Sequence, residues 1–201
     1  DATITEGATL TDSGSITFTD LDLTDTPTAT EVTKSVTTAL TLTAAQQTAI
    51  EDAFTISADA GNTNNGTINW DYTITEGELN FLAAGETITV VYTITVDDAN
   101  GGSDTQEVTV TINGANDAPV ISFVDVDAAI TEGTTLTDSG SITFADLDLT
   151  DTPTATEATK SVTTALTLTA AQQTAIEDAF TISADAGNTN NGTINWDYSI
   201  T

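Results

Sequence analysis

The chain has 201 residues, with 31 acidic side chains and two basic ones, Lys34 and Lys160, for a formal net charge of −29. Such a chain offers no basic patch to a phosphate backbone, so the composition excludes nucleic acid as a partner. No apolar run reaches the roughly 18 residues that a membrane helix needs, so membrane insertion is not expected. No stretch has the pattern of a signal peptide, and we expect an internal segment of a longer protein.

The sequence lacks His, Cys and Met. Disulfides therefore cannot stabilise the fold, and zinc, copper and iron sites, His-based triads and thiol nucleophiles are not expected. Oxygen ligands remain, and these suit calcium. Solubility or adaptation to salt is an alternative reason for so much acid.

A repeat of 126 residues dominates the chain. Residues 1–75 match residues 127–201, and only five positions differ: Thr3/Ala129, Ala8/Thr134, Thr19/Ala145, Val32/Ala158 and Thr73/Ser199. Such fidelity indicates a recent duplication within an array, which is typical of spacers rather than of enzymes. We predict a complete domain at 1–115, a calcium-binding linker at 116–126 and a truncated repeat at 127–201.

The second repeat lacks the counterparts of residues 76–114, which include two of the best strand candidates. A sheet protein without two strands would expose its core and free strand edges. We therefore expect either completion by strands exchanged with another chain or truncation after folding.

Strands are predicted where apolar and polar residues alternate. In 67–75, Ile68, Trp70, Tyr72 and Ile74 share one face and Thr, Asn and Asp the other. The same period recurs in 87–96, around Val108, Val110 and Ile112, and at Ile16 and Phe18. This pattern predicts half-buried antiparallel sheets. Together with the turns between them, the strands predict an all-β chain of tandem antiparallel β-sandwich domains.

One short helix per repeat interrupts this pattern. Thr43 and Gln46 form a candidate capping box, and Ala45, Ala49, Ile50, Ala53 and Phe54 lie close to one face. The segment recurs at 169–180, and we expect both helices to close a sandwich without catalytic content.

Four acidic groups are candidates for metal binding. They are Asn116-Asp117 before Pro119; Asp97, Asp98 and Asp104 in a turn; Glu132, repeated at Glu6; and Asp146-Leu-Asp148, repeated at Asp20-Leu-Asp22. Alternate residues at a strand end point the same way, so Asp146 and Asp148 can reach one cation. Calcium needs six to eight oxygen ligands, which several such groups could supply. The alternative is that Asp and Asn only shape turns.

A second loop, residues 59–66, is rich in Gly and Asn and is repeated at 185–192. A plain tight loop is the favoured interpretation, since both residue types tolerate left-handed backbone, and a loop calcium is the alternative.

The stretch DDANGGSDTQEVTVTINGANDAPV, residues 97–120, resembles the end of VCBS-type repeats of large bacterial RTX-type surface adhesins, and residues 78–98 resemble the same family. The order of acidic groups is also similar to that of cadherin repeats. The resemblance implies Ig-like or cadherin-like domains with calcium between neighbours.

By that resemblance, the calcium ligands would come from one domain with its linker and from the next domain. The first set is Asp98, Asn116 and Asp117, and the second is Glu132, Asp146 and Asp148. Further ligands would be Asp97, Asp104, Asp125 and Asp127. Glu6, Asp20 and Asp22 match the second set but lack a preceding linker here, so weak binding or none is expected.

The expected function is a calcium-rigidified spacer on the bacterial surface that projects a distal binding domain, with neighbouring repeats as partners. We do not expect an enzyme, because no carboxylate pair lies among aromatic residues that could bind a sugar. A ligand-binding adhesive module for glycan, ice or another cell is the alternative. The alternation of Trp70 with Ile68 and Tyr72, however, predicts that Trp70 lies in the core.

Overall fold

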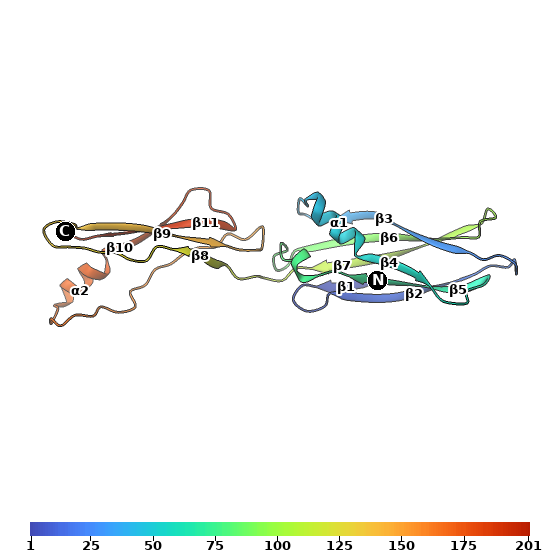
Figure 1. Cartoon of the computed structure of the whole chain (residues 1–201), viewed down its shortest axis with the longest axis horizontal. Helices are drawn as coiled ribbons and strands as arrows, with labels where there is room; N and C mark the ends of the chain where they lie inside the picture. The colour runs from blue at the N-terminus through green and yellow to red at the C-terminus, as the bar shows by residue number, and fades with distance from the viewer. The chain divides into compact units, whose positions relative to one another are not determined.

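A computed structural model describes residues 1–201 (Figure 1). The chain divides into two compact units, unit 1 at Asp1–Asn116 and unit 2 at Asp117–Thr201. Neither unit contains a helix with the length and apolar character required to cross a membrane.

Unit 1 consists of two β-sheets and two short helical segments. Its elements are β1 (Ala2–Thr5), β2 (Thr11–Thr19), β3 (Thr28–Thr37), α1 (Ala44–Asp52), β4 (Phe54–Ala58), β5 (Asn65–Thr73), the 3-10 turn η1 (Glu76–Glu78), β6 (Thr87–Asp97) and β7 (Ser103–Asn113). One sheet has the order β1-β7-β6-β3 and the other β2-β5-β4. All pairs are antiparallel except β1 with β7. The all-β prediction is confirmed.

The two sheets of unit 1 enclose one apolar core. On β6, Ile88, Val90, Tyr92 and Ile94 are buried while the residues between them are more exposed, as strand alternation requires. Ile68, Trp70 and Tyr72 of β5 belong to the same core. Between the sheets, the ring of Phe54 stacks on that of Tyr92 with centroids 4.1 Å apart. The predicted core position of Trp70 is thus confirmed.

Helix α1 begins where the sequence predicts. Thr43 is its N-cap, and Thr43 and Gln46 form the reciprocal capping box. The helix ends at Asp52, so Phe54 starts β4 rather than extending the helical face. Near its C-terminus the Ile50 carbonyl accepts hydrogen bonds from the hydroxyls of Tyr72 (3.1 Å) and Tyr92 (2.9 Å), which join the helix to both sheets.

Unit 2 has a single sheet. Its elements are β8 (Val120–Val124), β9 (Thr137–Ala145), α2 (Ala170–Glu177), β10 (Phe180–Ala184) and β11 (Asn191–Ser199). The sheet has the order β10-β11-β9-β8, and every pair is antiparallel. The counterparts of β1 and β3, at 128–131 and 154–163, are not strands. In unit 1 these two strands pair only with β7 and β6, which have no counterparts in unit 2.

The segment predicted as a linker, residues 116–126, contains strand β8. Its residues pair with the last four residues of β9, from Ala145 back to Ile142. Beyond the strand, the Asp125 carbonyl accepts a hydrogen bond from the indole Nε1–H of Trp196 at 2.5 Å. The middle of the predicted linker therefore belongs to the sheet of unit 2.

Candidate metal sites

A cluster of three aspartates follows strand β9 in unit 2. Each of Asp146, Asp148 and Asp151 has a carboxylate oxygen within 4.8 Å of one in the other two, so the group could hold a metal ion. Asp146 is 5% exposed and Asp148 is fully buried. Asp151 is partly exposed. Because an isolated buried carboxylate is costly, two of them beside a third carboxylate require a compensating charge or proton.

Backbone contacts fix this cluster. The Asp148 N–H donates to Oδ1 of Asp146 (3.1 Å), and the Asp151 N–H donates to the Asp148 carbonyl (3.2 Å). The buried Asn190 exchanges two bonds with Asp146: its carbonyl accepts from the Asp146 N–H (2.8 Å), and its Nδ2 donates to the Asp146 carbonyl (2.9 Å). The Asn-rich loop thus positions the first aspartate, a role that its composition does not reveal.

Asp117 adds a fourth acidic residue. Its backbone N–H donates to Oδ2 of Asp148 at 2.8 Å, while Oδ1 of Asp148 is buried and has no hydrogen-bond partner. Burial raises the pKa of Asp148 above its usual value, and the negative charges of Asp151, Asp146 and Asp117 raise it further, against the lowering effect of the Asp117 N–H. A cation coordinated by Oδ1 would satisfy this atom, so the donor set fits an oxygen-binding metal.

Unit 1 contains the equivalent cluster of Asp20, Asp22 and Asp25, with oxygens within the same 4.8 Å. Asp22 is exposed here, whereas its counterpart Asp148 is buried. Oδ2 of Asp25 accepts a hydrogen bond from Nδ2 of Asn100 at 3.0 Å. The two clusters have the same sequence but different surroundings.

The structure separates Asp98 from Asn116. Asp98 precedes β7 and Asn116 follows it, and 11 residues of extended chain span roughly 35 Å. Oδ1 of Asp98 instead accepts the backbone N–H groups of Asn100 (2.7 Å) and Gly102 (2.9 Å), and these bonds, with Gly102 the stronger influence, lower the pKa of Asp98. Asp98 and Asn116, two members of the first expected set, therefore lie at opposite ends of β7.

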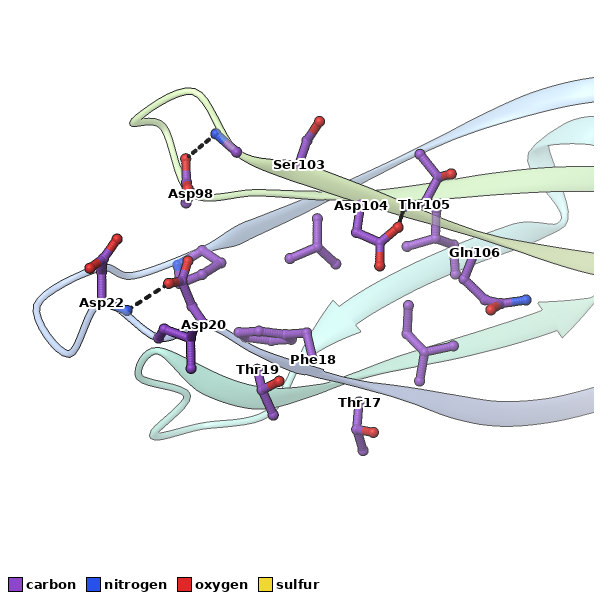
Figure 2. Close-up of a pocket in the computed structure, with 16 residues that line it drawn as sticks. Thr17, Phe18, Thr19, Asp20, Asp22, Asp98, Ser103, Asp104, Thr105 and Gln106 are labelled. Carbon is purple, nitrogen blue, oxygen red and sulfur yellow. Dashed lines mark hydrogen bonds between the residues drawn. The ribbon is translucent and has the colours of Figure 1, made fainter.

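Asp98 lies near the aspartates of its own unit instead. Figure 2 shows Asp20 and Asp22 following β2, with Asp98 and Asp104 on the hairpin opposite; all four line one groove. Asp97 is exposed on the same hairpin, where its Oδ1 accepts the Ala99 N–H at 2.7 Å.

Glu132 is similarly distant from Asp146. It is exposed and precedes β9, whereas Asp146 follows that strand, and nine extended residues span about 30 Å. The Asp125 N–H donates a hydrogen bond to the carbonyl of Ser141, in the middle of β9 (3.0 Å). Asp127, two residues further along the chain, is exposed. These three residues do not join the cluster after β9.

Glu6 has a different environment from its exposed counterpart Glu132. It is 4% exposed, its N–H donates to the Asn113 carbonyl (3.0 Å), and its Oε2 accepts the Ala115 N–H (2.9 Å). These bonds hold the chain after β7 against the start of unit 1. Glu6 lies before β2 and Asp20 after it, so the two do not share a site.

Of the predicted ligands, the structure brings together Asp117, Asp146 and Asp148 in unit 2. In unit 1 it brings together Asp20 and Asp22, with Asp98 and Asp104 lining the same groove. Asp25 and Asp151 were not among the predicted ligands, although the repeated spacing Asp-x-Asp-x-x-Asp is visible in the sequence. A search with protein-family models finds no match to this chain, and a search among curated proteins finds no significant similarity.

Proposed function

We propose that this chain is a calcium-rigidified spacer repeat of a bacterial surface adhesin, built from Ig-like or cadherin-like domains. The observation that carries the proposal is the buried Oδ1 of Asp148, which has no hydrogen-bond partner within a cluster of three carboxylates. Further support comes from the near-identical repeat, the net charge of −29 and the motifs that resemble adhesin repeats.

Calcium is the cation that this donor set suits best. All the side-chain donors are oxygens, and the chain has no His or Cys to favour a softer metal. Asp146, Asp148 and Asp151 would supply carboxylate oxygens, with Asp117 beside them, and Ca²⁺ takes such ligands in flexible geometry. Mg²⁺ demands a stricter octahedral arrangement and serves as the discriminating control.

The mechanical consequence follows from the place of Asp117 in the chain, at the first residue of unit 2. Without a cation, the clustered carboxylates repel one another and the raised pKa of Asp148 reflects the cost. With calcium bound, that repulsion is offset and the start of unit 2 is fixed to its own sheet. The join between repeats stiffens outside the cell, where calcium is abundant, and a distal binding domain is held away from the surface.

Thermal unfolding in millimolar Ca²⁺, in Mg²⁺ and in excess chelator tests the metal site. A ligand that binds only the folded state stabilises it by roughly 2.7 kcal/mol at a hundredfold excess over Kd. We expect a calcium-specific rise in Tm that the double variant Asp146→Ala, Asp148→Ala abolishes. The matched control is Asp20→Ala with Asp22→Ala, which makes the same change in unit 1 and should leave the rise intact.

Superimposable melting curves in calcium and chelator would mean that the aspartates only shape turns. The stiffening itself is tested by small-angle scattering of the chain in calcium and in chelator. We expect a larger and better-defined maximum dimension with calcium; an unchanged dimension would contradict the spacer mechanism even if the metal binds.

A further inference from the structure

The same strand has different neighbours in the two repeats. In unit 2, β9 pairs with β11 along one edge and with β8 along the other. In unit 1 its counterpart β2 pairs with β5, and its second edge has no strand. Residues 142–145, which pair with β8, are matched by residues 16–19 of β2, and only Ala145/Thr19 differs. Among residues 1–201, the edge that pairs with β8 in unit 2 has no pairing strand in unit 1.

A groove of about 780 Å³ lies along this free edge (Figure 2). One side is formed by residues 16–22 of β2 and the following loop, and the other by residues 102–106 at the start of β7. Ile94 and Val96 of β6, from the opposite sheet, also line it. The groove thus lies between the two sheets. It combines apolar side chains, among them Phe18, Ile94 and Val96, with four aspartates and an unpaired strand edge.

The side chains of β8 are suited to such a groove. Val120, Ile121, Phe123 and Val124 are 65%, 58%, 57% and 47% exposed in unit 2, where no second sheet covers them. A strand of this composition in the groove of unit 1 would contact both sheets and bury far more apolar surface. Addition of a strand to a free sheet edge is a common mode of recognition, because the backbone bonds supply affinity and the side chains specificity.

Trp196 and Trp70 independently indicate that a strand like β8 would occupy the groove of unit 1. In unit 2, Nε1–H of Trp196 donates to the Asp125 carbonyl, one residue beyond β8. Its counterpart Trp70 lies at the same register, opposite Gly14 as Trp196 lies opposite Gly140, and its indole N–H makes no hydrogen bond. A strand in the β8 register would bring a carbonyl to this donor.

We propose that the groove of unit 1 is a docking site for the segment 117–126 of a second copy of this repeat. The segment lies antiparallel to β2, with Val120 opposite Thr19 and Val124 opposite Ile16, and its Asp125 carbonyl accepts the Trp70 indole N–H. The N–H of its Asp117 then meets Asp22, the counterpart of Asp148. Strand docking would in this way complete the acidic cluster of unit 1; this last point rests on the proposed calcium function.

The test uses the whole ¹⁵N-labelled chain and a blocked synthetic peptide of residues 117–126. We expect saturable shifts of the Trp70 indole resonance and of the amides of residues 16–19, with the Trp196 indole resonance unchanged. The control peptide carries Ile121→Asp and Phe123→Asp, and a second has the same residues in scrambled order. Because only the peptides change, the fold of the chain is not at risk.

Absence of saturable binding, equal binding of the scrambled peptide, or shifts confined to unit 2 would each overturn the docking proposal. The titration is carried out in chelator and in calcium. Calcium should tighten binding by about fivefold or more, the lower end of usual coupling between two sites. Equal affinity in both conditions would leave the docking site intact but remove its link to calcium, while the melting experiments decide the metal site of unit 2 separately.

Discussion

The backbone N–H of Asp117 donates to Oδ2 of Asp148, and so joins two residues 31 positions apart in the sequence. The other oxygen of Asp148 is buried with no hydrogen-bond partner. The residue that begins unit 2 is therefore held by a carboxylate whose second oxygen is free to bind a cation, and this relationship leads to the first prediction.

Asp148→Asn should affect the stability of the metal-free chain and its stabilisation by calcium in different ways. The amide keeps an oxygen for the Asp117 N–H and removes a buried charge, so in chelator the Tm should stay equal or rise. In calcium the Tm gain should fall sharply, because a carboxylate ligand is lost. Calorimetric melts in both conditions measure this, with the exposed Asp127→Asn as control for the change in net charge. An undiminished calcium gain in Asp148→Asn would place the metal elsewhere.

Tyr72 and Tyr92 should be energetically coupled through the Ile50 carbonyl. Burial raises the pKa of both phenols. Each single change to Phe leaves the carbonyl one partner and should cost about 0.5–1.5 kcal/mol. The double variant leaves it none, and should cost more than the sum of the two single changes. A double-mutant cycle from urea unfolding gives the coupling, and strict additivity would contradict the shared acceptor.

Gly14→Ala should destabilise unit 1 alone. A Cβ at Gly14 would lie 2.5 Å from the Trp70 ring, which packs against Phe54 and cannot move freely. Overpacking of this kind costs about 1–3 kcal/mol. Gly77→Ala, where a Cβ meets no atom within 4 Å, is the matched control and should be close to neutral. Gly140→Ala should repeat the effect in unit 2 against Trp196, as followed by amide resonances of each unit on heating.

The turn held by Asp98 should make unit 1 sensitive to acid. Its pKa is lowered in the folded state by the N–H groups of Gly102 and Asn100. The stabilisation is therefore present above the ordinary value of 3.8 and is lost as the pH falls through the lower, folded-state pKa.

Asp98→Ala should accordingly lower the Tm of unit 1 at neutral pH, and its difference from wild type should shrink as the pH falls through that range. Melts at a series of pH values measure the effect. The control is Asp71→Ala, whose exposed carboxylate makes no hydrogen bond. A Tm difference that does not vary with pH would show that the charge on Asp98 is not what stabilises the turn.

Local patterns were sufficient to predict much of unit 1. Strict alternation in β5 and β6 placed Trp70 and Tyr92 in the core, and the Thr43–Gln46 capping box placed the start of α1, because these signals act over a few neighbouring residues. The site was less predictable. Spacing identified Asp146 and Asp148, but their neighbour Asn190 comes from a loop about 44 residues away, and only the strand pairing of β9 with β11 brings it there.

The repeat separates what the sequence determines by itself from what the tertiary structure decides. Strands β2, β4 and β5 recur in unit 2 as β9, β10 and β11, and α1 recurs as α2, because these strands pair with one another and the helix is capped by its own residues. The segments of β1 and β3 have nearly the same sequence at 128–131 and 154–163 but do not form strands there, since no β7 or β6 is present to accept their hydrogen bonds. Alternation fixes which residues suit a strand; the presence of a partner edge decides whether the strand forms.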